Sequence, residues 1–106
     1  MRRIWFKPDC KRWIPAKEKT TTFRLHRHDW LHEVDNGSRY KPKPSGLKLS
    51  LTPILHCSKE TAIEHHYRTE GPFKSKEEFI AWLEKNRLKL PDFGWLHRIE
   101  VLEGAR

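Results

Sequence analysis

Apolar and polar residues alternate in two stretches of the chain, and this pattern predicts two strands. Leucine occupies every second position of residues 47–52, and Trp, His, Ile and Val alternate with Leu, Arg and Glu over residues 95–101. A period of two places one set of side chains on the buried face of a sheet. Pro53 interrupts the first pattern, which predicts a bulge or an edge position before the strand continues at residues 54–55. Residues 4–6, Ile-Trp-Phe, predict a further short strand.

One helix is predicted both by its start signal and by helical spacing. Ser75 and Glu78 have the S-x-x-E spacing of a capping box. Phe79, Trp82 and Leu83 then fall on one helical face. We therefore expect Trp82 to be buried.

Two shorter helices are predicted from weaker signals. Ser58 is expected to cap a helix that ends near His66, with Ala62 and Ile63 facing inward. A brief helix over residues 8–14 is ended by the proline that follows it.

The remaining segments complete the expected order of elements. Residues 18–24, Glu-Lys-Thr-Thr-Thr-Phe-Arg, contain three consecutive β-branched threonines and predict a strand. Residues 25–37 mix charges with aromatic residues and end in Asn-Gly, which predicts a long loop, and residues 41–46 predict a second, basic loop. The whole order predicts one α+β domain over residues 1–106, a small mixed β-barrel flanked by short helices.

The charge of the chain favours some partners over others. The sequence has 22 Lys and Arg against 14 Asp and Glu, a formal net charge of +8. This excess favours contact with polyanions such as RNA, although a solvated basic surface explains the same count. No apolar run is long enough to cross a membrane, and two cysteines, Cys10 and Cys57, fit a reducing compartment. We therefore expect a cytoplasmic monomer with no membrane partner.

The spacing of reactive residues argues against several enzyme classes. Seven histidines invite a zinc site, but no C-x-x-C or H-E-x-x-H motif occurs. The five glycines are scattered, so no phosphate-binding loop is formed, and no G-x-S-x-G marks a serine hydrolase. We expect neither a metal nor a cofactor.

Two short motifs carry a resemblance to a known family. The first, K-T-x-T-x-R, comprises Lys19, Thr20, Thr22 and Arg24. The second starts at Glu70 and continues through Gly71, Phe73, Ser75, Glu77, Glu78 and Phe79. In this order, between a short helix and a final apolar strand, the motifs resemble the ASCH domain, a member of the PUA-like barrel superfamily. The resemblance extends over residues 4–101.

The ASCH resemblance implies a PUA-like barrel with an RNA-associated cleft. The residues that it assigns to the cleft are Lys19, Thr20, Thr22, Arg24 and Glu70. Some small bacterial members are similar to amidohydrolases that remove the acetyl group from N4-acetylcytidine. By that resemblance, Lys19 takes the proton of Thr22, Thr22 attacks the amide carbon, and Glu70 helps to protonate the departing amine. The chain departs from the family at Lys17, where relatives often carry glycine, and at Pro72.

The same residues suit binding without reaction. Lys19 and Arg24 can hold a phosphate, and Thr20 and Thr22 can bond a base or a sugar. Glu70 can accept from an exocyclic amine. A purely structural ion pair between Lys19 and Glu70 also fits the sequence.

The two basic loops interleave cations with aromatic residues, a mixture that suits a nucleic-acid strand. The candidate contacts are Arg27, Trp30, Arg39, Tyr40, Lys41 and Lys43. We predict that the protein binds RNA or a modified nucleoside, with amidohydrolysis as the alternative. The sequence does not decide whether the protein is an enzyme.

Overall fold

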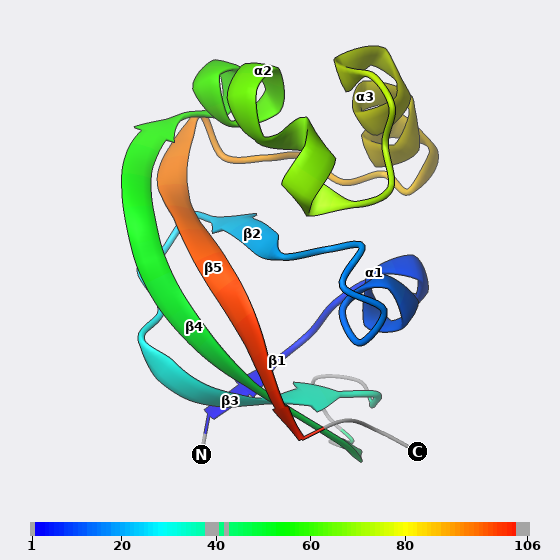
Figure 1. Cartoon of the computed structure of the whole chain (residues 1–106), viewed down its shortest axis with the longest axis vertical. Coiled ribbons are helices and arrows are strands. Elements are labelled where there is room, and N and C mark those ends of the chain that lie inside the picture. The colour runs from blue at the N-terminus through cyan, green and yellow to red at the C-terminus, as the bar shows by residue number, and fades with distance from the viewer. Residues whose placement is uncertain (1, 38–40, 42, 104–106) are drawn as a thin grey trace.

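The chain forms an α+β fold in which the helices lie on the concave side and at one end of a curved sheet (Figure 1). The computed structural model describes residues 2–37, 41 and 43–103. Its elements are β1 (Arg2–Ile4), α1 (Pro8–Trp13), β2 (Thr21–Arg24), β3 (Trp30–Asp35), β4 (Pro44–Ser58), α2 (Lys59–Glu70), α3 (Lys76–Lys85) and β5 (Phe93–Glu103).

The strands form one mixed sheet of five strands in the order β1-β3-β4-β5-β2. β1 pairs parallel with β3, and the other neighbouring strands pair antiparallel. β1 and β2 are therefore the edges of the described sheet. No pairing of described strands closes this sheet, so the barrel stays a prediction.

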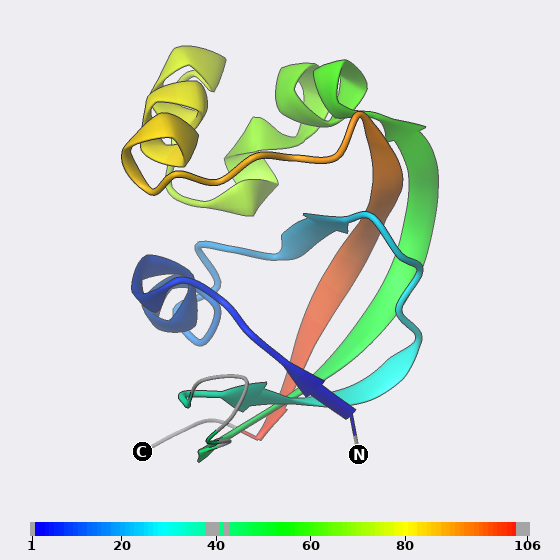
Figure 2. The ribbon, with the colours of Figure 1, turned by 180° about the vertical axis from the view of Figure 1, so that it is seen from behind.

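β4 bends where its pairing is irregular. The register with β5 shifts between Pro53 and Leu55, which confirms the bulge predicted there. The pairing of β3 with β4 ends at Leu51. Pro53 has no backbone N–H to donate, and its position beyond this pairing requires no hydrogen bond to β3. Bulges bend strands. β4 and β5 are curved, and β2 and α1 lie on their concave side (Figure 2).

The long loop predicted at residues 25–37 is wrong in its second half, because this segment contains β3. His32 and Val34 are buried, whereas Glu33 between them is partly exposed. The segment therefore has the period of two, but one of its inward residues is a histidine, and the flanking charges hide the pattern.

Other boundaries also differ from the predicted ones. The strands predicted over residues 4–6 and 18–24 are β1, Arg2–Ile4, and β2, Thr21–Arg24. β4 begins at Pro44, inside the loop predicted at residues 41–46. α2 begins after the predicted cap, Ser58, but continues past His66 to Glu70. The Ser58 side chain accepts a hydrogen bond from the backbone N–H of Thr61, which confirms the predicted cap.

The core consists of two apolar clusters. The first joins β1, the end of α1 and the lower parts of β3, β4 and β5 through Ile4, Ile14, Val34, Leu47, Leu49, Leu51 and Ile99. The second lies under α2 and contains Phe23, Ala62 and Leu96. Both Leu96 and the next residue, His97, are fully buried. Strict alternation in β5 is therefore lost at this point, because Leu96 packs in the second cluster while His97 makes the polar contacts described below.

The cap of α3 differs by one residue from the predicted capping box. Ser75 Oγ accepts a hydrogen bond from the Glu78 backbone N–H at 3.2 Å, as expected. Glu78 Oε2 accepts from the backbone N–H of Lys74 at 2.8 Å rather than from that of Ser75. Both side chains still satisfy free N–H groups at the start of the helix.

Trp82 is only partly buried, which corrects the prediction that it is a core residue. Phe79 and Leu83 form the buried face of α3. The Trp82 ring packs 5.4 Å from that of Trp13, and its Nε1 donates to Asp9 Oδ2 at 2.8 Å. An indole needs a partner for its N–H, and Asp9 supplies that partner at the boundary between core and surface.

We predict that Phe79→Ala lowers the free energy of unfolding by about 3–5 kcal/mol, because it leaves a cavity at a side chain that is 2% exposed. Urea denaturation measures this change. Ile80→Ala on the same helix is the matched control, since Ile80 is 37% exposed. The control should lose about 1 kcal/mol or less. Equal losses in both variants would contradict the assigned helix face.

Candidate functional site

A cavity of about 510 Å³ lies between α1, β2, the end of α2, α3 and the segment that follows α3. Its wall is largely apolar and includes the aromatic residues Trp5, Phe6, Phe23, Phe79 and Trp82. The polar and charged residues of the wall are Lys7, Cys10, Lys19, Thr22, Arg24, Glu70 and Lys89. Four of the five predicted cleft residues, Lys19, Thr22, Arg24 and Glu70, therefore share one cavity.

Lys19 and Glu70 form a buried ion pair in this wall. Lys19 Nζ lies 2.7 Å from Glu70 Oε2 and donates a second bond to the Glu70 carbonyl oxygen at 3.2 Å. Lys19 is 4% exposed and Glu70 is 6% exposed. Glu70 ends α2, whereas Lys19 lies between α1 and β2. The pair therefore joins two segments that are far apart in the sequence.

A tight turn after α1 delivers Lys19 to this position. Lys17 has a left-handed backbone with φ of 62°. The backbone N–H groups of Glu18 and Lys19 both donate to the Trp13 carbonyl oxygen, at 2.9 and 3.2 Å. A left-handed residue other than glycine costs roughly 1–2 kcal/mol. Lys17 thus adopts a backbone conformation for which glycine is better suited.

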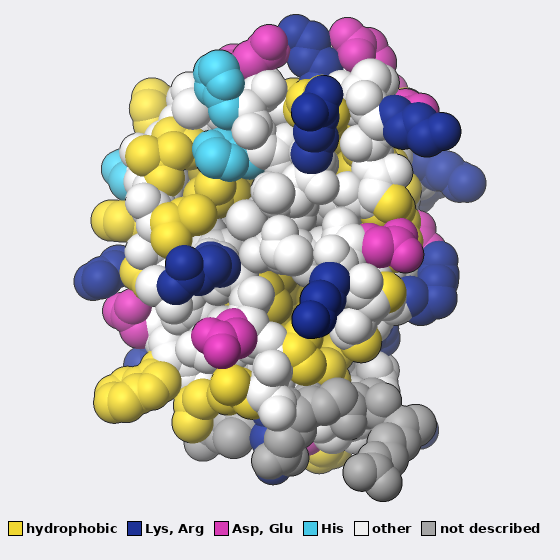
Figure 3. Space-filling model, in the orientation of Figure 1, with side chains coloured by type: hydrophobic (Ala, Val, Ile, Leu, Met, Phe, Trp, Pro, Cys, Tyr) yellow, Lys and Arg dark blue, Asp and Glu magenta, His cyan; other side chains and the backbone are white. Residues whose placement is uncertain are grey.

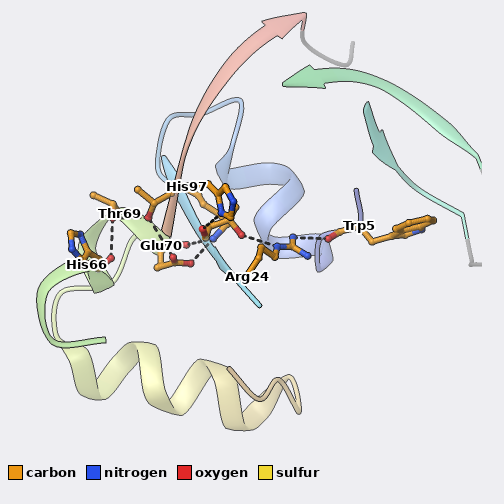
Figure 4. A network of polar contacts seen from close by, with 9 residues as sticks. Trp5, Arg24, His66, Thr69, Glu70 and His97 are labelled. Carbon is orange, nitrogen blue, oxygen red and sulfur yellow. Dashed lines mark hydrogen bonds and ion pairs between the residues drawn. The ribbon is translucent and has the colours of Figure 1, made fainter. Parts of the chain in front are cut away.

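Two threonines support the Glu70 carboxylate (Figure 4). Thr21 Oγ1 donates to Glu70 Oε1 at 3.4 Å and lies 2.8 Å from Thr69 Oγ1. Thr69 Oγ1 in turn donates to the His66 carbonyl oxygen at 2.9 Å. Thr21 is not among the cleft residues that were predicted from the sequence.

Thr22 and Arg24 form a second set of contacts beside the ion pair. Arg24 Nε donates to Thr22 Oγ1 at 3.1 Å, and Arg24 Nη2 donates to the Trp5 carbonyl oxygen at 2.9 Å. The guanidinium carbon lies 4.7 Å from the centroid of the Phe6 ring. Burial lowers the pKa of Arg24, but a guanidinium stays charged because its ordinary pKa is so high.

Thr20 is the predicted cleft residue that does not line the cavity. Its backbone N–H donates to the Thr69 carbonyl oxygen at 2.8 Å, and its carbonyl oxygen accepts from the Ile99 N–H at 2.8 Å. Thr20 therefore fastens the end of α2 to β5 through its main chain.

Cys10 also belongs to the cavity wall and is buried. Burial raises the pKa of its thiol. A protonated thiol is a poor nucleophile, so Cys10 contributes an apolar surface to the wall.

Three histidines, His28, His32 and His97, lie together and do not line the cavity. The rings of His28 and His97, and those of His28 and His32, are 5.5 Å apart between centroids. His97 Nε2 accepts from the His28 backbone N–H at 2.8 Å, and its Nδ1 lies 3.3 Å from the Thr22 carbonyl oxygen. These two contacts fit a neutral ring that donates from Nδ1. His97 therefore joins β2, β5 and the segment after β2.

Burial holds all three histidines in their neutral forms. It lowers the pKa of His28 to about 4, with further lowering by His97 and His32. It also lowers the pKa of His32 and of His97. Among the described residues, His32 Nε2 has no hydrogen-bond partner.

Those predicted nucleic-acid contacts that the structure describes do not line the cavity. Trp30 is 76% exposed and has a φ of 77°, and Arg27 pairs with Asp29 at 3.7 Å. Lys41 and Lys43 are exposed. Arg39 and Tyr40 lie outside the described residues. Figure 3 shows Lys and Arg spread over one face of the molecule rather than gathered in one patch.

The base of the loop that carries these lysines is held next to the cavity. Asp35 Oδ1 accepts from the backbone N–H groups of Gly37 and Lys43, each at 2.7 Å. The Gly37 carbonyl oxygen accepts from Trp5 Nε1 at 3.0 Å. Trp5 therefore contacts both the cavity and the start of the basic loop.

Sequence reasoning missed the segments that complete the cavity wall. Trp5, Phe6 and Lys7 come from the connection between β1 and α1, and Lys89 comes from the connection between α3 and β5. A charged residue beside apolar ones in a connection has no periodic pattern. The available signal was the Trp-Phe-Lys run at residues 5–7, of which Trp5 and Phe6 were assigned only to the strand predicted over residues 4–6.

Within the described part of the chain, no group of three or more His, Cys, Asp or Glu residues is placed to hold a metal ion. The described helices include none that is long and apolar enough to cross a membrane.

Comparison with known proteins relates the chain to others by fold alone. No protein-family model matches the sequence, and no curated protein matches it significantly. The chain is similar to the crystal structure of protein EF3133 from Enterococcus faecalis V583, which bears the family label DUF984. That match has a TM-score of 0.54 and 15% identity, and it covers 97% of this chain and 81% of the other. The two chains therefore share a fold, and the likeness carries no statement about activity.

We predict that Glu70→Leu is far more destabilising than the double change Lys19→Met with Glu70→Leu. The single change leaves Lys19 as a buried charge without its partner, which should cost about 3–5 kcal/mol of unfolding free energy. The double variant removes both charges and should recover most of that loss. Chemical denaturation of the three proteins measures the difference. A double variant as unstable as the single one would show that the pair is not the source of the cost.

We also predict that stability falls as the pH drops from about 6.5, the ordinary histidine value, toward about 4, the pKa of His28. The unfolded chain binds protons at its histidines in this range before the folded chain does, so acid favours unfolding. Asp9 and Asp35 have pKa values lowered from 3.8 and therefore act at lower pH. Urea denaturation across this pH range measures the slope.

His28→Leu should flatten that slope, whereas His65→Leu is a control because His65 is exposed on α2. His28 uses its backbone N–H toward His97, so this contact survives the substitution. The same slope in the His28 variant and the wild type would contradict the assignment.

Proposed function

We propose that the cavity binds RNA or a modified nucleoside. The observation that carries this proposal is the position of Lys19, Thr22, Arg24 and Glu70 in the wall of a single, largely apolar cavity. Ligand sites typically combine an apolar wall with a few polar groups that set orientation. The polar groups of this wall are the types that bind a base, a sugar and a phosphate.

The dimensions of the cavity support a ligand of nucleoside size. Its volume of about 510 Å³ lies within the common range for small-molecule sites. Trp5, Phe6 and Trp82 supply aromatic surface in the wall, and RNA-binding proteins commonly stack unpaired bases on such side chains. An aromatic wall with charged groups at one side thus suits a flat, polar base.

The charge of the wall supports a ligand that carries negative charge. Lys7, Lys19, Arg24 and Lys89 are basic, and Glu70 is the acidic residue among the lining side chains. Glu70 is already paired with Lys19. The remaining positive charge favours a nucleotide of an RNA strand over a cationic or neutral metabolite.

We further propose that the fold is an ASCH domain of the PUA-like superfamily. The mixed sheet of five strands with short helices is compatible with this family. The left-handed Lys17 and the shared cavity of both motifs support it.

Amidohydrolysis of N4-acetylcytidine is the second candidate, and one observation favours it. Lys19, Thr22 and Glu70, the residues of the implied reaction, line the same cavity. Their contacts favour binding instead. The Lys19 ammonium donates to Glu70 at 2.7 Å and has no lone pair with which to accept a proton from Thr22. The described structure has no hydrogen bond between Lys19 and Thr22, and Thr22 Oγ1 accepts from Arg24 instead.

Thr22→Val tests both functions, because valine keeps the β-branched shape of the strand and removes the hydroxyl. We predict that the wild type binds single-stranded RNA or nucleosides without hydrolysing N4-acetylcytidine. The valine variant should bind more weakly by about 0.5–1.5 kcal/mol, the usual value of one hydrogen bond. Titration calorimetry measures the affinity, and chromatographic detection of cytidine measures turnover.

Thr61→Val is the control, since its hydroxyl contacts Ser58 at the start of α2 and does not line the cavity. Turnover by the wild type that disappears in Thr22→Val would favour the amidohydrolase. A wild type that neither binds nor hydrolyses these compounds would refute the proposed function.

A further inference from the structure

Arg24 is a cation of the cavity wall without a carboxylate partner. Among the described residues it forms no ion pair. Its Nε donates to the Thr22 hydroxyl oxygen and its Nη2 donates to the Trp5 carbonyl oxygen, and both acceptors are neutral. A guanidinium has five N–H donors, so several of them are left for a ligand. A buried positive charge normally has an anionic partner.

Glu70 does not serve as that partner. Its Oε2 is 2.7 Å from Lys19 Nζ, and its Oε1 accepts from Thr21. The carboxylate of the wall is therefore already neutralised by a different cation. Arg24 therefore has no ion pair of its own among the described residues, although the nearby Glu70 carboxylate still favours its charged form.

Two further cations line the same cavity, and they come from two different connections of the chain. Lys7 follows directly after Trp5 and Phe6, the residues that Arg24 contacts. Lys89 comes from the connection between α3 and β5. Neither lysine side chain has a hydrogen bond or an ion pair within the described part of the chain. The cavity thus combines three basic side chains that have no acidic partner among the described residues.

We propose that the cavity recognises a phosphate ester, with the phosphate of a nucleotide bound by Arg24, Lys7 and Lys89. This inference rests on the proposed function and narrows its ligand from a nucleoside to a nucleotide. Arg24 supplies a planar pair of donors that matches two phosphate oxygens, and the lysines supply point charges. The base then lies against the apolar wall, in which Glu70 supplies the carboxylate.

The phosphate could belong to a free mononucleotide or to an RNA strand, and the test separates these sources. Titration calorimetry is carried out with the four ribonucleosides, their 5′- and 3′-monophosphates, a short single-stranded RNA and inorganic phosphate. We expect a monophosphate to bind roughly tenfold more tightly than its nucleoside, the gain typical of hydrogen bonds to a charged group. An RNA strand is the natural ligand if the RNA binds more tightly than every monophosphate. In that case, changing Lys41 and Lys43 to alanine should lower the affinity for the RNA and leave the affinity for the monophosphates unchanged.

Two variants locate the phosphate. Lys89 is exposed, so Lys89→Ala should fold normally, and Arg24→Gln removes the charge while keeping an amide donor. Each should lower the ratio of monophosphate affinity to nucleoside affinity. Lys85→Ala is the matched control, because Lys85 is exposed on α3 and does not line the cavity. This control should leave the ratio unchanged.

Each result has a distinct meaning. Equal affinities for nucleosides and monophosphates would overturn the phosphate site and leave the proposed function standing. Inorganic phosphate that binds as tightly as the nucleotides would overturn nucleotide recognition. No binding of any nucleoside, nucleotide or RNA would refute the proposed function itself. An unchanged affinity ratio in both Lys89→Ala and Arg24→Gln would remove these residues from the site.

Discussion

The buried ion pair between Lys19 and Glu70 is the contact on which the arrangement of the cavity depends. Each charge is unfavourable in the interior without the other, so the start of β2 and the end of α2 are held together. Thr21, Thr69 and the main chain of Thr20 add hydrogen bonds between the same two segments. Because the pair also neutralises the carboxylate, the remaining charge of the wall is positive. One interaction thus sets both the shape and the electrostatic character of the candidate site.

Residues with a strong local signal could be predicted from the sequence. The alternating leucines from Leu47 to Leu51 gave a strand, because a period of two over several residues matches a half-buried strand and does not match a helix. Ser58 and Ser75 gave the starts of α2 and α3, since a side-chain cap acts within three residues. The two motifs gave four residues that share the cavity, because the ASCH resemblance assigned both segments to one cleft although they are distant in sequence.

Features that depend on distant contacts could not be predicted in this way. β3 was missed because His32 takes an inward position that is usually apolar, and only the neighbouring His28 and the fold explain its burial. Trp82 was placed too deep because its polar partner, Asp9, lies on another helix. The same holds for Lys7 and Lys89, which meet at the cavity only after α1 and α3 have packed. A helix or strand pattern describes one segment, whereas a cavity is made by several.

The position of β5 has a consequence for the order in which the molecule assembles. β5 is the last strand along the chain, yet it lies between β4 and β2, and β2 pairs with no other described strand. During synthesis on the ribosome, the Thr21–Arg24 strand therefore waits without a partner until residues 95–98 have left the exit tunnel. Pairing across so long a separation is slow and exposes unpaired edges. The two threonines of this strand, Thr21 and Thr22, are polar and β-branched, and such residues suit a strand that stays in water for some time before it joins the sheet.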